Sequence, residues 1–116
     1  MSTEPETPFA SWQQFDALDL RIGQIIRAEI FPEARKPAFQ LWIDFGPLGV
    51  KKSSAQITAD YTLEELKGKK VAAVVNFPPK QIAHFQSECL VLGVVSGSNV
   101  TLLVPDKPVE NGWRIA

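Results

Sequence analysis

The stretch FQLWIDFG, which begins at Phe39, alternates strictly between apolar and polar side chains, and no other feature of the sequence constrains the fold as much. A repeat of two residues is that of a β-strand with one buried and one solvated face. Trp42 falls on the solvated face and points away from the predicted interior. The apolar face holds Phe39, Leu41, Ile43 and Phe45.

Five other segments have strand character, and turns or proline-containing loops separate them. Residues 21–31 also alternate, which predicts one face made of Ile22, Ile26, Ala28 and Ile30. The remaining predicted strands are residues 50–57, 69–77, 89–95 and 100–105. The strand at 69–77 is almost entirely apolar, so we expect it to be buried on both faces.

Two short helices are predicted from capping boxes, in which Ser or Thr is followed three residues later by Glu or Gln. Ser11 with Gln14 starts one helix, and Thr62 with Glu65 starts the other, which Gly68 ends. The element order predicts an all-β domain with short helices, a five-stranded Greek-key barrel of the OB-fold type with N- and C-terminal extensions. A β-sandwich fits less well, because it has no place for the helix between the third and fourth strands.

The N-terminal part of the chain differs from the rest in composition. A leader rich in Pro, Glu and Thr comes first, and Trp12, Phe15 and Leu18 then fall on one face of the first helix. This apolar stripe needs a surface to cover, either on its own domain or on a second chain. We therefore divide the chain into residues 1–18, the leader and helix, and residues 19–116, the barrel domain.

The composition excludes several kinds of site. With one histidine and one cysteine, the chain lacks the four Cys or His ligands of a usual structural zinc site. It has no GxxxxGK[ST] or GxGxxG run to hold nucleotide phosphates. Pairing of His84 with Cys89 for catalysis is disfavoured, because Cys89 begins an apolar strand and reads as a core residue. We expect no cofactor and no metal, and a binding protein rather than an enzyme.

Location and charge limit the partners. No apolar run approaches the roughly 20 residues that span a bilayer, and the acidic N-terminus lacks the features of a signal peptide. We therefore expect a cytoplasmic protein that does not insert into membranes. A net charge of −1 and a pI near 5.8 argue against a strong nucleic-acid binder. Residues 67–101 nevertheless carry four lysines against one glutamate.

Polar residues interrupt the chain between two of its most apolar strands, in the stretch NFPPKQIAHFQSE that begins at Asn76. A loop held between rigid strands is where binding groups tend to lie. Pro78 and Pro79 restrict this loop, so less conformational entropy is lost when it binds.

Four stretches, in this order and spacing, resemble the EMAP-type tRNA-binding domain family: DLRIGQIIRAEIFPEA, KKSSAQIT, LKGKKVAAVVNFPPKQIAHFQSECLVLG and LLVPDKPVENGWRI. The resemblance covers residues 19–116 and implies an OB-fold that contacts tRNA. Within the family, the pattern is similar to a group of small homodimeric bacterial proteins described as export-related chaperones. That similarity implies a two-fold dimer built from the N- and C-terminal extensions.

The resemblance also implies site residues. The loop presents an asparagine, basic residues and a serine to the RNA backbone in relatives, and the matching positions here are Asn76, Lys80 and Ser87. A lysine attracts phosphate, and an amide and a hydroxyl bond phosphate or 2′-OH groups. Asn76 and Ser87 could instead bond the backbone of the loop. With few basic residues in the loop, we expect weak tRNA binding through backbone contacts. The further candidates are His84, Lys51 and Lys52.

The alternative function is that of an ATP-independent chaperone, a homodimer that binds unfolded or secretory preprotein segments. Exposed aromatic surface either closes a subunit interface or accepts an extended peptide. The candidate peptide groove consists of Trp42, Phe77 and Phe85. The candidate dimer interface consists of Trp12, Phe15, Leu18, Val109 and Trp113.

Overall fold

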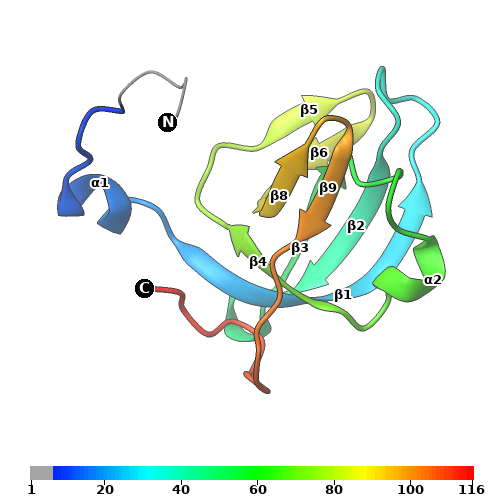
Figure 1. The fold of residues 1–116 in the computed structure, drawn as a ribbon. Coiled ribbons are helices and arrows are strands. Elements are labelled where there is room, and N and C mark those ends of the chain that lie inside the picture. Colours follow the sequence, from blue (N-terminus) through cyan, green and yellow to red (C-terminus); the bar gives the residue numbers. More distant parts are fainter. Residues whose placement is uncertain (1–6) are drawn as a thin grey trace.

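Five antiparallel strands curl into a nearly closed barrel (Figure 1). The computed structural model describes residues 7–116, so the start of the predicted leader lies outside the described residues. The strands of the barrel are β1 (Leu20–Ile30), β2 (Phe39–Asp44), β3 (Val50–Ala55), β4 (Lys70–Val74) and β7 (Leu90–Val91). They lie in the order β3-β2-β1-β4-β7, so a three-stranded meander is followed by a return to the free side of β1. This path confirms the predicted Greek-key barrel of the OB-fold type.

Apolar side chains fill the barrel as the alternation in β2 predicts. Phe39, Leu41 and Ile43 are buried, and so is Phe45 just beyond the end of the strand. Strand β4 is buried along Val71–Val74, which confirms that both of its faces are covered.

The predicted face of β1 is wrong at two positions. The register between β1 and β2 shifts by one residue at Ile26, which lies in a β-bulge. The bulge reverses the alternation, so that Ile25 is in the core and the Ile26 side chain is 50% exposed. Ile30, at the end of the strand, is exposed as well, whereas Ile22 and Ala28 are buried as predicted.

Residues 87–89 close the barrel against β3. The N–H of Glu88 donates to the Lys52 carbonyl (2.7 Å), and Glu88 Oε1 accepts from the Lys52 N–H (2.9 Å). The N–H of Ser54 donates to Ser87 Oγ (3.0 Å). Side-chain oxygens thus replace part of a backbone ladder between these two edges.

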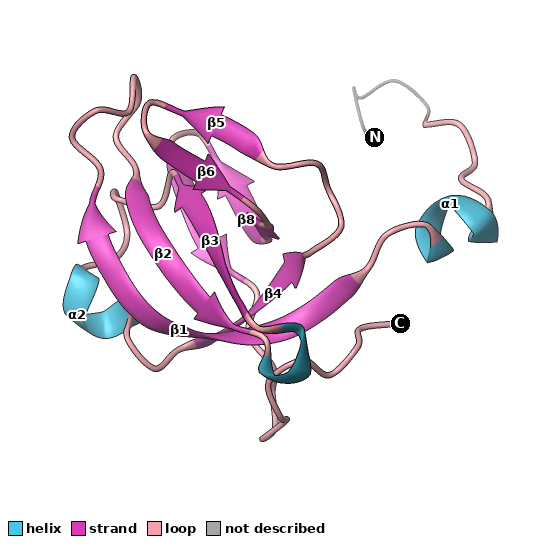
Figure 2. Ribbon diagram, turned by 180° about the vertical axis from the view of Figure 1, so that it is seen from behind, coloured by secondary structure: helices cyan, strands magenta, loops and turns pink. Residues whose placement is uncertain are grey.

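Both predicted capping boxes are present, at Ser11 with Gln14 and at Thr62 with Glu65. The helices are α1 (Trp12–Asp16), α2 (Leu63–Leu66) and a 3₁₀ turn, η1 (Gly46–Leu48). Helix α1 has no buried residue and stands away from the barrel (Figure 2). Within residues 7–116, no helix has the length and apolar character needed to cross a membrane.

Two small hairpins complete the fold: β5 (Lys80–Ile82) with β6 (Phe85–Ser87), and β8 (Gly93–Ser96) with β9 (Asn99–Leu102). The first lies where we expected an irregular loop, and its turn holds Ala83 at a φ of 52°. The second shows that the predicted strand at 89–95 is divided at Leu92. The Leu92 N–H donates to the Ala72 carbonyl, and the Leu92 carbonyl accepts from the Leu103 N–H. On either side of Leu92, β7 pairs with β4 and β8 pairs with β9.

The C-terminal extension lies along the outer edge of β1, where the Ile22 N–H donates to the Trp113 carbonyl (3.0 Å). Gly112 makes this docking possible. Its φ is +90°, and a Cβ at this position would lie 2.4 Å from the carbonyl oxygen of Phe45. Only glycine combines that backbone conformation with so close an approach.

We expect Gly112→Ala to lower the free energy of unfolding and to loosen the C-terminal extension. A positive φ costs a non-glycine residue on the order of 1–3 kcal/mol, and the contact with Phe45 adds a clash. Gly68→Ala is the matched control, because Gly68 has a φ of +85° but nothing within 4 Å of the added Cβ. Urea unfolding followed by circular dichroism measures both variants. Equal losses of stability would show that the close contact with Phe45 does not form.

Candidate nucleic-acid interface

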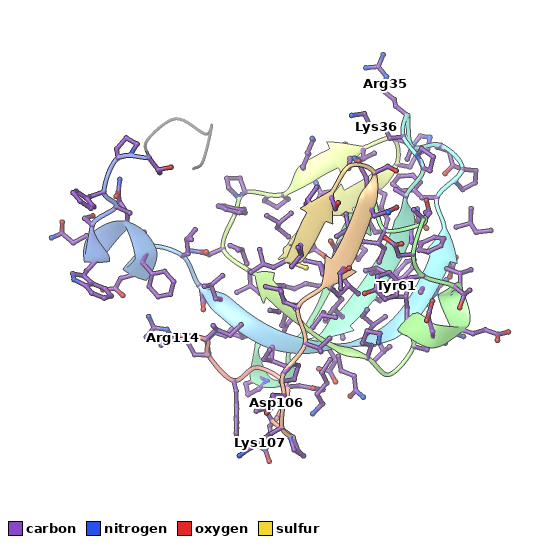
Figure 3. All side chains as sticks on the ribbon, in the orientation of Figure 1. Arg35, Lys36, Tyr61, Asp106, Lys107 and Arg114 are labelled. Carbon is purple, nitrogen blue, oxygen red and sulfur yellow. The ribbon has the colours of Figure 1, made fainter. Side chains whose placement is uncertain are left out.

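A cleft of about 510 Å³ lies between the β1–β2 loop, the β5–β6 hairpin and the end of β3. Its basic side chains are Arg35 and Lys36 from the loop and Lys80 from β5, against one carboxylate, Glu33. Figure 3 shows Arg35 and Lys36 at the outer end of the loop. Ser54, Gln56 and Gln81 supply polar groups to the lining. We call this the cationic cleft.

The cations of the cationic cleft are available to an anion. The ion pairs within residues 7–116 are Asp19 with Arg21 and Arg27 with Glu29, and neither involves a residue of this cleft. Lys80 is exposed and lies opposite Ser87 in the hairpin register. Folding therefore concentrates positive charge at one place on a chain whose net charge is −1.

A row of cationic and aromatic side chains crosses the outer face of the barrel. Arg27, Trp42 and Lys52 lie in register on β1, β2 and β3. The Arg27 Cζ lies 4.3 Å from the centroid of the Trp42 ring, and the Lys52 Nζ lies 5.2 Å from that of Phe85. Cation–π contacts of this kind orient the two side chains, and the Arg27 guanidinium is also paired with Glu29.

The residues of the predicted peptide groove do not form one surface, because Trp42 and Phe85 pack together whereas Phe77 lines another cleft. Phe85 is 6% exposed and packs with Phe31 and Ala38 in a second, small core. Trp42 points away from the barrel interior, as predicted, but it is half-buried against this core, with its ring 5.7 Å from that of Phe85. Phe77 is exposed and lines a different cleft.

Asn76 is bonded to the segment that joins α1 to β1. Its Oδ1 accepts from the Asp19 N–H (2.8 Å), and its Nδ2 donates to the Ala17 carbonyl (2.8 Å). Both ends of the amide are therefore used within the chain, and Ser87 Oγ likewise accepts from β3. These contacts favour the structural interpretation of both side chains, although their partners lie outside the loop.

The other predicted RNA contacts lie on two elements. His84 is exposed in the turn of the β5–β6 hairpin, directly after Ala83. Lys51 and Lys52 are half-buried on β3, and the side chain of Lys52 leans over Phe85. The hairpin therefore carries Lys80 and His84, whereas the two β3 lysines lie on the sheet that it covers.

A smaller cleft of about 210 Å³ adjoins the cationic cleft, because Lys80 lines both. Its lining consists of Phe77, Pro78, Lys80, Ser87, Glu88 and Leu90, with the buried Cys89 behind them. Burial, which is the larger cause, and the nearby Glu88 charge together raise the pKa of the Cys89 thiol to about 12. The thiol is therefore protonated at neutral pH and is no nucleophile. We call this the aromatic cleft.

The predicted dimer residues lie at the two ends of the described chain. Trp12, Phe15 and Trp113 are exposed, and Leu18 and Val109 are half-buried. Both views place α1 and the C-terminal end on the same side of the barrel (Figures 1 and 2). Phe9, which the sequence analysis did not single out, is fully exposed as well.

Sequence reasoning missed Arg27, Arg35 and Lys36. The last two were part of a segment predicted only as a turn between two strands. A usable signal existed, because loops after the first strand of an OB-fold are frequent ligand contacts and this loop holds adjacent basic residues. Arg27 lies within the predicted strand 21–31 but outside its predicted apolar face, and its proximity to Trp42 depends on the strand register. No group of three or more potential metal ligands is present in the described part of the chain.

Known proteins resemble this chain in sequence and in fold. The family model described as putative tRNA binding domain matches residues 20–114. The chain is 35% identical over 112 residues to the methionine–tRNA ligase of Pyrococcus horikoshii, an alignment that covers 97% of this chain and 15% of the ligase. The chain thus spans about 15% of the length of the first curated relatives.

Two solved structures have higher sequence identity to this chain, and each is aligned with it over its whole length. The chaperone CsaA of Bacillus anthracis str. Ames is 53% identical with a TM-score of 0.90, over 94% of this chain and 100% of that one. The CsaA chaperone protein of Picrophilus torridus is 50% identical with a TM-score of 0.87, over 93% and 100%. The resemblance predicted from the sequence is confirmed, and the chain belongs to the family of putative tRNA binding domains.

Proposed function

We propose that the chain is a non-enzymatic RNA-binding module that holds the sugar–phosphate backbone of tRNA in the cationic cleft. The observation that carries the proposal is the convergence of Lys80, from the loop predicted to bind RNA, with Arg35 and Lys36. The family match and the tRNA ligase relatives support tRNA as the RNA.

The chemistry of the cleft suits backbone contacts. Arg35 offers a planar group that can bond a phosphate twice, whereas Lys36 and Lys80 act as point charges. Contacts of this kind position an RNA without reading its bases. Few cations on an acidic protein give modest affinity that falls with salt. The module therefore recognises the charge and the backbone shape of tRNA rather than its base sequence.

The salt dependence of tRNA binding tests this proposal. With three phosphate contacts, log affinity should fall against log salt with a slope of about −2 to −3. Lys80→Ala should reduce the size of that slope by about one. Lys107→Ala is the control, because Figure 3 places Lys107 at the opposite end of the molecule from Arg35 and Lys36. A wild-type affinity that does not change with salt would contradict the proposal.

We also propose that the module is a homodimer in which α1 and the C-terminal extension meet their counterparts. The support is an exposed aromatic surface, with the Trp12 side chain 85% and the Trp113 side chain 52% exposed on one side of the barrel. Aromatic surface of this extent on a small domain typically marks an interface.

A second candidate function is ATP-independent binding of unfolded polypeptide. An apolar cleft of about 350 Å³ lies between the end of β3 and the β7–β8 segment, where Ile57, Leu90, Val95 and Val100 line it. The two similar solved structures are both of CsaA chaperones. This cleft offers apolar side chains to a peptide, whereas Trp42 is packed against Phe85.

We expect the protein in several-fold molar excess to slow the aggregation of a chemically denatured client without ATP. The effect should persist at high salt, because apolar burial is not screened. Val95→Lys should weaken it, since Val95 lines the apolar cleft. Val94→Lys is the control, because Val94 is similarly exposed but does not line the cleft. Light scattering that shows no suppression with several clients would rule out this second function.

A further inference from the structure

The aromatic cleft has two kinds of wall. Phe77, Pro78 and Leu90 are apolar, and the Phe77 and Leu90 side chains are 44% and 49% exposed. Lys80, Ser87 and Glu88 supply polar groups on the rest of the lining. A ligand that fits both kinds of wall has a flat apolar surface and a polar edge.

The polar groups are fixed by the closure of the barrel. Glu88 Oε1 accepts from the Lys52 N–H, which holds the carboxylate in place. Ser87 Oγ accepts from the Ser54 N–H, so its own O–H remains a donor. The cleft therefore presents a fixed anionic acceptor and a donor, and the carboxylate repels any phosphate that would enter.

A nucleobase fits these walls, and a phosphate does not. The face of a base stacks on an aromatic ring, and its exocyclic amino groups donate to carboxylates. The neighbouring phosphate needs a cation, and Lys80 lines both the aromatic and the cationic cleft. One nucleotide can thus place its base beside Phe77 while its phosphate lies on Lys80, continuous with the RNA backbone in the cationic cleft.

We propose that the aromatic cleft binds one unpaired nucleobase of the RNA, stacked against Phe77. This inference rests on the proposed RNA-binding function and specifies its ligand as RNA with a single-stranded nucleotide next to the bound backbone. Bases in a duplex are stacked on each other and cannot enter, whereas splayed bases in loops and ends can.

Two RNAs test the proposal: a blunt RNA duplex of two strands, which has no unpaired base, and the same duplex with a short single-stranded 3′ extension that carries 2-aminopurine. Phe77→Leu keeps an apolar side chain but removes the ring. It should weaken binding of the extended RNA on the order of tenfold, the effect of losing one base–aromatic stack, and leave the affinity for the blunt duplex unchanged. It should also abolish the change in 2-aminopurine fluorescence on binding. Phe77→Tyr should restore both properties.

The controls separate this inference from the proposed function. Phe9→Leu makes the same substitution at an exposed phenylalanine outside the cleft. It should change neither the affinity for the two RNAs nor the fluorescence response. Lys80→Ala should weaken the binding of both RNAs. If Lys80→Ala weakens binding and Phe77→Leu does not, the base site is overturned while the RNA-binding function stands. Failure of the wild type to bind either RNA overturns both.

Two further outcomes would also overturn the base site. One is that Phe77→Leu weakens the binding of both RNAs equally and lowers the melting temperature of the protein, which would show a structural role for the ring. The other is that Phe77→Leu weakens binding of an unfolded apolar peptide and not of the extended RNA. The cleft would then be a pocket for a peptide side chain.

Discussion

The variant Arg35→Glu/Lys36→Glu/Lys80→Glu is expected to bind tRNA at least about 100-fold more weakly than the wild type near 0.1 M salt. Each substitution replaces an attraction to phosphate with a repulsion. A unit charge about 4 Å away contributes about 1 kcal/mol even in bulk water, so three reversals change the binding free energy by several kcal/mol before screening. Fluorescence anisotropy with labelled tRNA measures the loss.

The matched control is Lys67→Glu/Lys69→Glu/Lys107→Glu, which changes the net charge by the same amount outside the cationic cleft. Long-range repulsion alone would weaken both variants equally, whereas a local site weakens only the first. Lys69 and Lys107 line a separate cleft near residues 104–108. A larger loss of tRNA affinity in the control variant would place the RNA in that separate cleft and contradict the proposed site. Circular dichroism must show that both variants are folded.

The strands and caps could be predicted because their signals are local. The alternation around Leu41 and the capping boxes at Ser11 and Thr62 depend on neighbours within a few residues, and the structure confirms them. The bulge at Ile26 could not be predicted in this way. It is visible only when β1 is aligned with β2, and a pattern read along one strand has no information about its partner.

The candidate site was only partly predictable for the same reason. Lys80 could be identified from the loop and its resemblance to a known family. Its proximity to Arg35 and Lys36 is a consequence of the way the β5–β6 hairpin folds back toward the β1–β2 loop. The same packing buries Phe85, which looked available in the sequence. The structural role of Asn76 could not be predicted either, because its hydrogen-bond partners, Asp19 and Ala17, belong to a distant part of the chain.

Deletion of residues 1–18 is expected to convert a homodimer into a monomer at tens of micromolar protein. A stable interface buries about 800 Å² on each partner, and a large aromatic side chain contributes about 150–250 Å² when fully buried. Exposed aromatic residues at the two ends of the chain therefore supply a substantial part of the required area. Light scattering coupled to gel filtration measures the mass.

Point variants distinguish loss of the interface from loss of the fold. The double variant Trp12→Ala/Phe15→Ala keeps the chain length, and neither residue is buried in the protomer, so its melting temperature should change only through dissociation. Ile26→Ala/Ile30→Ala, which changes two exposed apolar residues in the half of β1 farther from α1 (Figure 1), is the control and should remain dimeric. Deletion also removes the Ala17 carbonyl that Asn76 bonds, so the double variant is the cleaner test. A wild type that is monomeric at this concentration, or a double variant that stays dimeric, would show that the aromatic surface around α1 does not join two copies of the chain and is free for another partner.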